Sequence, residues 1–315
     1  MSATRTDRFK SALNTFPPSV QSFLQHLPQQ GGQLSPDACN TLMGLLDVSV
    51  EELMIRLLPL AKVFSMAAVS GFHVGAVALA KANPADGHMN LYLGANMEFE
   101  HLALSMSIHA EQAVVINAWH HGARRIKCIA TSELPCGHCR QFLQELCGSS
   151  DLMVLKPDGE GHGHHVKRLS EIFPAPFSPM DLGNDRSFMT APKTIRKLKL
   201  VHPSDDPVVQ AALTAAMTSY APYTGNLAGC ALQTPEGEIV NGSYVESVAY
   251  NPSISPLHSV LLRLNLMAFE EKHAIDRIVL VENPTRIRQK DLVEMLVGSW
   301  VQDIELEYYT AQEEV

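Results

Sequence analysis

The sequence predicts an α/β protein in which one layered domain occurs twice, after a short helical unit. Helix and strand patterns alternate over residues 72–155, which is typical of a layered α/β sheet. The chain then repeats itself, because Gly94 and Glu98 match Gly242 and Glu246 at a constant offset of 148 residues. A length of 315 residues, about twice that of a typical domain, agrees with two such units.

The first fifty residues are expected to form the helical unit. Apolar residues recur at spacings of three and four over residues 20–27, as on one face of a helix. A second helix is predicted to begin at Ser35, which is an N-cap residue followed by Pro36. A third is predicted to begin at Ser49, because Glu52 completes a capping-box pattern, and to continue through Ala61.

The first layered domain is predicted from the spacing of its apolar residues and from its turn-forming residues. Apolar runs on either side of the turn-rich segment 83–87 predict a pair of strands. The remaining signals alternate between helix and strand. In order, we expect strands over 72–80 and 91–99, a helix over 109–119, a strand over 125–130, a helix over 136–146 and a strand over 152–155.

The predicted organisation has four parts: a helical unit at 1–50, a catalytic domain at 51–182, a linker at 183–200 and a degenerate copy at 201–315. Five prolines and glycines between residues 174 and 194 indicate the linker. Carrying the offset of 148 forward places His109 on Leu257 and Glu111 on Ser259, at the start of a helix predicted over 259–267. The second copy therefore keeps the fold and lacks the polar residues of the first.

Composition argues for small-molecule chemistry. The chain has 24 Lys and Arg against 33 Asp and Glu, a net charge of −9, and it shows no basic run. Proteins that bind nucleic acid backbones usually present a basic face, so no nucleic acid partner is expected. Six scattered cysteines do not form a disulfide framework, which favours a reducing cytoplasmic location.

No membrane association is expected. The first residues carry charges and are not followed by the apolar stretch of a secretory signal. The longest uncharged stretch, residues 63–80, contains serines, glycines and a histidine, which do not suit a membrane-spanning helix.

Three short segments carry the predicted chemistry. His109 begins one predicted helix, and Cys136 and Cys139 share one face at the start of another, with 26 residues between His109 and Cys136. A helix start favours thiolates, and three protein ligands leave the fourth position of a tetrahedral zinc open, as in catalytic sites. Glu111, two residues after His109, would be a carboxylate beside that open position, where proton transfer is needed.

Two alternatives remain for the cysteine pair. Cys128, His138 or Cys147 would close a structural zinc site as fourth ligand, although Glu111 would then have no role. The sequence Cys-Gly-His-Cys also occurs as a redox dithiol, but here the aromatic residue usual before the first cysteine is missing.

The pattern His-x-Glu with Pro-Cys-x-x-Cys is the signature of zinc nucleobase deaminases. The chain resembles cytidine deaminase from about residue 50 onward, specifically the two-domain, homodimeric class with a degenerate second domain. The motifs that carry the resemblance are Phe72-His-Val-Gly-Ala, Gly94-Ala-Asn-Met-Glu-Phe, His109-Ala-Glu-Gln, Pro135-Cys-Gly-His-Cys-Arg-Gln-Phe and Gly242-Ser-Tyr-Val-Glu. It implies a three-layer sheet with helices on both faces in each copy.

The resemblance also implies a reaction and a role for each residue. Cytidine and 2′-deoxycytidine would be hydrolysed to uridine, 2′-deoxyuridine and ammonia, in pyrimidine salvage. One zinc ion per chain would be held by His109, Cys136 and Cys139, and Glu111 would move protons to ring N3 and to the departing amine. The substrate would be contacted by five further residues: Asn96 and Glu98 at the ribose hydroxyls, Phe72 beside the base, the Ala110 N–H at the base carbonyl, and Phe177 from a neighbouring subunit.

Several of these residues could instead have purely structural roles. Asn96 and Glu98 would also serve to end a strand and cap a turn, and Phe72 would also fit a core. The histidines His162, His164 and His165 lie in a glycine-rich stretch and are expected to form a solvated loop. An enzyme acting on a base in RNA or DNA shares the zinc signature but needs a basic groove and aromatic side chains. A non-enzymatic dimeric scaffold would fit residues 201–315 alone.

Overall fold

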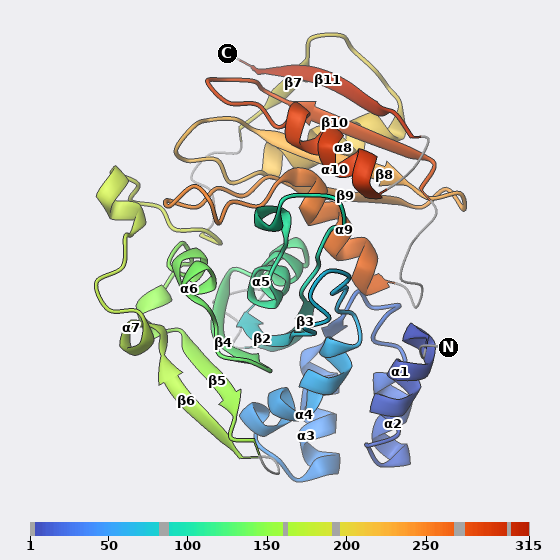
Figure 1. The fold of residues 1–315 in the computed structure, drawn as a ribbon, viewed down its shortest axis with the longest axis vertical. Helices are drawn as coiled ribbons and strands as arrows, with labels where there is room; N and C mark the ends of the chain where they lie inside the picture. Colours follow the sequence, from blue (N-terminus) through green and yellow to red (C-terminus); the bar gives the residue numbers. More distant parts are fainter. Residues whose placement is uncertain are drawn as a thin grey trace.

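The computed structural model describes residues 4–81, 88–159, 163–190, 196–267, 275–300 and 304–314. It contains two β-sheets, each with helices packed on its faces, and Figure 1 shows one half of the chain stacked on the other. The predicted duplicated α/β fold is therefore confirmed. No helix in the described ranges is long and apolar enough to cross a membrane.

The N-terminal segment is helical, as predicted, and it also contributes to the first sheet. Ser35 and Ser49 cap the two helices that were expected to begin there, each accepting a hydrogen bond from the third residue beyond it. The short strand β1 pairs with β3 of the sheet. The elements are α1 (Arg5–Leu13), α2 (Pro18–Leu24), β1 (Gln33–Leu34), α3 (Pro36–Leu46) and α4 (Val50–Lys62).

The first sheet has the strand order β1-β3-β2-β4-β5-β6 and is antiparallel except for the β4–β5 pair. Alternate residues of β2 face opposite sides, so Val77 packs in one apolar cluster with α4 and Ala78 packs in another with α5. The elements are β2 (Gly75–Lys81), β3 (Met89–Ala95), α5 (Ala110–His120), β4 (Arg125–Thr131), α6 (Gly137–Leu143), β5 (Met153–Pro157), β6 (His164–Arg168) and α7 (Leu169–Ile172).

Strand β6 corrects one expectation. His164 and His165 lie on this strand, paired with Pro157 and Lys156 of β5, and not in a loop. This strand forms because it pairs with β5, and the glycine-rich sequence beside these histidines gave no sign of that pairing. His162 lies outside the described residues, and the described histidines of this strand belong to no group that could hold a metal ion.

The second sheet has the order β7-β11-β10-β8-β9, and its one parallel pair, β10–β11, corresponds to β4–β5. Val279 of β10 packs in a cluster with α8, whereas Leu280 faces the cluster that contains α9. The elements are β7 (Leu198–Leu200), α8 (Pro207–Thr218), β8 (Ala228–Gln233), β9 (Ile239–Ser243), α9 (Pro256–Met267), β10 (Arg277–Glu282), α10 (Lys290–Trp300) and β11 (Leu306–Glu313).

Glycine positions show how the two copies correspond. A Cβ atom on Gly94 would lie 2.3 Å from the backbone nitrogen of Val114, and one on Gly242 would lie 2.5 Å from that of Val260. Only glycine allows the strand to approach the helix this closely. The strand glycines are offset by 148 residues, but the two valines are offset by 146.

The predicted alignment of the copies is therefore wrong beyond the strand. The bridges Met97–Ile108 and Val245–Ile254 are equivalent, and they show that the connection in the second copy is two residues shorter. The counterpart of His109 is Ser255, not Leu257, and the counterpart of Glu111 is Leu257, not Ser259. The conclusion that the second copy lacks these polar residues still holds.

The two copies share one apolar cluster, formed by buried side chains of α5 and α9 among others. Polar contacts also join the copies. The buried carboxylate of Glu145 accepts hydrogen bonds from Tyr220 Oη at 2.7 Å, Tyr223 Oη at 2.6 Å and the Val248 backbone nitrogen at 2.9 Å. The first copy therefore folds directly against the second.

The predicted linker, 183–200, leads into the second sheet. Residues 191–195 lie outside the described ranges, and Leu198–Leu200 form β7, which pairs with β11. Before the gap, Phe188 is buried against the first copy, where its ring centroid lies 4.9 Å from that of Trp119.

Candidate active site

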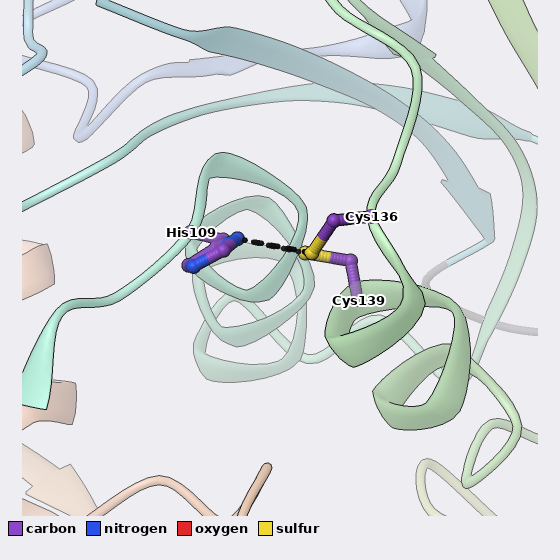
Figure 2. Close-up of side chains that lie close together, drawn as sticks. All are labelled: His109, Cys136 and Cys139. Atoms are coloured by element: carbon purple, nitrogen blue, oxygen red, sulfur yellow. Dashed lines mark hydrogen bonds between the residues drawn. The ribbon is translucent and has the colours of Figure 1, made fainter. Parts of the chain in front are cut away.

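The structure brings His109, Cys136 and Cys139 together. The Nδ1 atom of His109 lies 3.5 Å from Cys136 Sγ and 3.2 Å from Cys139 Sγ, and the two sulfurs are 3.6 Å apart (Figure 2). Among the described residues, these three side chains form the group of histidine, cysteine or acidic residues that lie close enough together to hold a metal ion.

Two helix starts position these three side chains. His109 occupies the N-cap position of α5, and Cys136 occupies the N-cap position of α6, with Cys139 one turn further on. Figure 2 shows the imidazole and the thiols pointing toward each other from the ends of the two helices. The positive end of each helix dipole favours thiolates here.

The geometry fits a tetrahedral zinc ion. With zinc–sulfur bonds of about 2.3 Å and zinc–nitrogen bonds of about 2.0 Å, tetrahedral angles separate two sulfurs by about 3.8 Å and a sulfur from a nitrogen by about 3.5 Å. The observed separations are close to these values. Cys128, His138 and Cys147 are not part of the group, so the closed structural site has no fourth ligand among the described residues.

The two thiols differ in acidity. Their mutual hydrogen bond lowers the pKa of Cys136 to about 4 and raises the pKa of Cys139. One thiolate therefore forms readily, whereas a second negative charge beside it is costly unless a cation shares it. This donor set is suited to a divalent metal, since two thiolates and a neutral imidazole would balance its charge.

Glu111 lies beside this group and is buried, with 4% of its surface exposed. Burial raises the pKa of its carboxyl group, which also forms a hydrogen bond with Cys139. A carboxyl group whose pKa is shifted toward neutrality can accept a proton and release it again near pH 7. The backbone N–H of Ala110 lies at the same helix start, in its first turn.

Asn96 and Glu98 follow strand β3 and support a neighbouring loop. The Asn96 side chain accepts hydrogen bonds from Ser65 Oγ and Val74 N and donates one to the Phe72 carbonyl, at 2.6, 2.8 and 2.9 Å. Asn96 thus holds the segment that carries Phe72, and Phe72 is 58% exposed. Phe72 is therefore not a core residue.

Glu98 accepts hydrogen bonds from the Val69 nitrogen, the Ser70 nitrogen and Ser70 Oγ, at 2.9, 2.8 and 2.5 Å. Partial burial acts to raise the pKa of Glu98, but the hydrogen bonds from Ser70 and Val69 outweigh it, and the pKa lies below its ordinary value. The turn-capping role that the sequence left open is thus present, and a role at the ribose remains a prediction.

Phe177 lies on the segment between α7 and the end of the first copy. Its backbone carbonyl accepts a hydrogen bond of 2.7 Å from Gln141 Nε2 of α6, and its ring is 44% exposed. The side chain is therefore free to contact a second molecule, and its predicted role across a subunit interface remains a prediction.

Sequence reasoning missed Gln112. Its Oε1 accepts a hydrogen bond of 3.0 Å from the His109 backbone nitrogen, and its Nε2 lies 3.1 Å from the Pro252 carbonyl and 3.3 Å from His138 Nε2. Gln112 therefore links His109 to a loop of the second copy. Its place directly after Glu111 was visible in the sequence, but the partner 140 residues away was not.

Comparisons with known proteins agree with this geometry. Two family models, both described as the cytidine and deoxycytidylate deaminase zinc-binding region, match residues 48–155 and 169–294. Cytidine deaminase from Aliivibrio fischeri is 37% identical over 278 residues, which is 88% of each chain. Cytidine deaminase from Aeromonas hydrophila is 37% identical over 306 residues, 96% of this chain and 98% of that one.

The chain belongs to the cytidine deaminase family. It is accordingly a zinc-dependent deaminase enzyme, and the redox and scaffold alternatives are set aside. A crystal structure of cytidine deaminase from Mycobacterium tuberculosis matches with a TM-score of 0.31 and 28% identity, covering 38% of this chain and 89% of that one. The second family match covers most of the second copy, although the residues described there form no group that could hold a metal ion.

Proposed function

We propose that this protein catalyses the zinc-dependent hydrolytic deamination of cytidine and 2′-deoxycytidine to uridine and 2′-deoxyuridine, releasing ammonia, as a step of pyrimidine salvage. The observation that carries the proposal is the buried carboxyl group of Glu111 beside the cluster of His109, Cys136 and Cys139. These three residues are the proposed ligands of one zinc ion per chain.

Zinc held there would supply a Lewis acid, which would make water nucleophilic at neutral pH. Glu111 supplies the proton transfers. It takes a proton from the attacking water and delivers it to ring N3 of the base. It then takes the proton of the hydroxyl group formed at C4 and gives it to the amine, which leaves as ammonia as the C4 carbonyl forms. The raised pKa of Glu111, caused by its burial, suits a group that must act as both base and acid.

Neighbouring residues are proposed to orient the nucleoside. The backbone N–H of Ala110 donates to the base carbonyl, and the exposed ring of Phe72 packs beside the base. Asn96 and Glu98 contact the ribose hydroxyls. This is compatible with their loop contacts, because a carboxylate has about four acceptor positions and Glu98 uses three of them.

Charge supports a nucleoside as the substrate, in preference to a nucleotide. Glu98 and Glu111 already place carboxyl groups at the site, and residues 94–100 contain no lysine or arginine. A 5′-phosphate would add about two negative charges without a partner. Free cytosine would lack the hydrogen bonds proposed between the sugar and Asn96 and Glu98, which discriminates against it.

We further propose that the protein acts as a cytoplasmic homodimer in which Phe177 of one subunit completes the site of the other. Support comes from the exposure of large apolar side chains on segments around the site, such as Phe72, Leu134 and Phe177. Exposed apolar groups of this size commonly mark an interface.

The direct test is to mix the purified protein with cytidine and follow the ultraviolet spectrum as cytidine becomes uridine. Deoxycytidine should react as well, whereas cytosine, dCMP and adenosine should react far more slowly. Comparable kcat/KM values for cytosine and cytidine would overturn the nucleoside assignment. No conversion of cytidine by zinc-loaded protein would overturn the proposed activity itself.

A further inference from the structure

A loop of the first copy, residues 99–107, connects two parts of the proposed site. Glu98, the proposed ribose contact, lies at its start, and His109, a proposed zinc ligand, lies just beyond its end. Two backbone hydrogen bonds of 2.8 Å between Met97 and Ile108 close the neck of the loop. The neck fixes the backbone before Glu98, so the backbone after Glu98 depends on whatever holds the loop.

The second copy holds this loop through the ring of Phe99. Phe99 follows Glu98 directly and is 4% exposed. Its ring centroid lies 5.2 Å from that of His258 and 5.5 Å from that of Trp300, both of which belong to the second copy. Aromatic pairs at such distances attract each other beyond the effect of burial. The neighbour of the proposed ribose contact is thus held between two side chains of the other copy.

Polar contacts hold the backbone of the same loop. Ser299 Oγ of the second copy donates a hydrogen bond of 2.7 Å to the Glu100 carbonyl. Burial lowers the pKa of His258 to about 3, although a hydrogen bond with the Met106 backbone acts to raise it. The His258 ring is therefore neutral near pH 7 and needs no buried counter-charge. Contacts at residues 99, 100 and 106 together attach the whole loop to the second copy.

The same arrangement also occurs in the opposite direction. Glu145, just beyond the end of α6, accepts a hydrogen bond of 2.9 Å from the Val248 backbone nitrogen of the second copy. Ser299 lies in the last turn of α10, which follows β10 as α6 follows β4. Val248 and Glu100 each lie two residues after the glutamate that caps a turn in its copy. Each copy therefore uses the end of the same helix to hold the equivalent loop of the other.

Contacts within the first copy leave the far side of Glu98 to this loop. The Glu98 carboxylate is bonded to the turn at Val69 and Ser70, and this turn is exposed. Those bonds keep Glu98 and the turn together without attaching them to the core. His109, in contrast, has its own anchor, because its backbone nitrogen bonds to Gln112. A change in the loop is therefore expected to affect Glu98 more than the metal cluster.

We propose that Phe99 is a positioning residue through which His258, Ser299 and Trp300 of the second copy set the orientation of Glu98 toward the ribose. The inference rests on the proposed function, because it concerns the same site. It gives the second copy, whose described residues form no metal cluster, a part in the choice between a nucleoside and a free base.

Trp300→Leu tests the proposal in zinc-loaded, full-length protein, with Trp119→Leu as the matched control. Both tryptophans are partly buried against the same apolar cluster and lie beside a phenylalanine ring, which for Trp119 is Phe188 at 4.9 Å. Trp119 lies at the end of α5 that is remote from His109. Both variants should lower the thermal midpoint. Only Trp300→Leu should raise the KM for cytidine, at least fivefold, with kcat within twofold of the parent.

Free cytosine gives a readout that a general loss of stability would not produce. Cytosine has no ribose, so its kcat/KM should stay within twofold in Trp300→Leu while that of cytidine falls. Trp300→Phe keeps an aromatic ring beside Phe99 and should restore the KM for cytidine to within twofold of the parent. Ser299→Ala removes only the hydrogen bond to Glu100 and should raise the KM about twofold.

Isothermal titration with uridine measures nucleoside affinity without turnover, and Trp300→Leu should weaken it at least fivefold. Equal changes in Trp300→Leu and Trp119→Leu, or unchanged KM and uridine affinity in Trp300→Leu, would overturn the proposal. If Trp300→Leu does not fold, an unchanged KM in Ser299→Ala would overturn it. A parent that does not convert cytidine would refute the proposed function, whereas the titration would still decide the positioning role. Absence of uridine binding to the parent would overturn that role too.

Discussion

The two copies of the domain share the residues that hold their loops and strands in place, and they differ in the residues that could carry out chemistry. Glu98 accepts hydrogen bonds from Val69, Ser70 and the Ser70 hydroxyl, and Glu246 accepts the same three kinds from Tyr223, Thr224 and the Thr224 hydroxyl. Gly94 and Gly242 likewise allow the same close contact between strand and helix. A carboxylate retained in a copy without a metal cluster thus has a structural role.

At the helix starts the copies diverge. The Val293 N–H bonds to the Gln289 carbonyl as the Arg140 N–H bonds to that of Cys136, so Gln289 and Leu292 take the positions of Cys136 and Cys139. The positions of His109 and Glu111 correspond to Ser255 and Leu257. None of these replacements disturbs the strands or the apolar faces of α5 and α9. The comparison teaches that this fold depends on its glycines, loop-capping carboxylates and apolar faces, whereas the residues at its helix starts are free to change function.

The largest effect is expected from removing the second copy. A chain ending at Asp185 would expose the apolar surface that α5 shares with α9, and Glu145 would lose Tyr220, Tyr223 and Val248. We expect insoluble or inactive protein, checked by gel filtration and the cytidine assay. A shortened protein that stays soluble, monomeric and fully active would refute the idea that the first copy depends on the second.

Glu111→Ala should lower kcat by about three or more powers of ten, because one carboxyl group serves several proton transfers. Zinc content and thermal midpoint should stay close to those of the parent, since the three proposed ligands are unchanged. Steady-state kinetics and elemental analysis check this together. Activity within tenfold of the parent would mean that Glu111 does not have the assigned role.

Glu98→Ala and Glu246→Ala form a matched pair across the copies. Each removes three hydrogen bonds to a loop, so each should lower the free energy of unfolding by about 1–3 kcal/mol in denaturant titrations. Only Glu98→Ala should also narrow the gap in kcat/KM between cytidine and cytosine. Equal effects of both variants on that gap would leave Glu98 with a structural role alone.

The smallest effect concerns the caps of the equivalent helices α4 and α8. Ser49 caps α4 with a neutral hydroxyl, whereas Asp206 caps α8 with a carboxylate that Arg277 also contacts at 3.0 Å. The hydrogen bond from Arg277 lowers the pKa of Asp206. Its contribution to stability is therefore present above the ordinary aspartate pKa and is lost as pH falls below about 4.

Asp206→Asn keeps a good cap and removes the ion pair, so it should cost about 0.5–1 kcal/mol at pH 7, with the difference from the parent disappearing in acid. Urea denaturation at several pH values measures this difference. Ser49→Asn is the control, and its difference from the parent should not vary with pH. A pH-independent cost for Asp206→Asn would show that the charge contributes nothing.

Features set by nearby residues were predictable from the sequence, and features set by distant contacts were not. The caps at Ser35 and Ser49 and the grouping of His109 with Cys136 follow from short motifs at the starts of helices. The pairing that makes β6 a strand depends on a neighbouring strand. Helix α6 ends at Leu143, three residues earlier than expected, and Glu145 just beyond it is buried against the second copy.

The equivalence of residues in the two copies beyond the strand was also not predicted correctly from the sequence. A two-residue shortening between Val245 and Ile254 leaves only short identities at the new offset, such as Ser107-Ile108 with Ser253-Ile254, and the bridge at Ile254 and the contact of Gly242 with Val260 reveal it. For the same reason the contact of Gln112 with Pro252, and those of Phe99 with His258 and Trp300, required the packed structure.

The central claim is that one copy holds the zinc chemistry and the other does not. Elemental analysis of active, full-length protein tests it most directly, with Cys139→Ala as the variant and Cys147→Ser as the matched control outside the cluster. The account predicts one zinc ion per chain in the parent and in Cys147→Ser, and loss of both zinc and activity in Cys139→Ala. Two tightly held zinc ions per chain, or active protein without zinc, would contradict it.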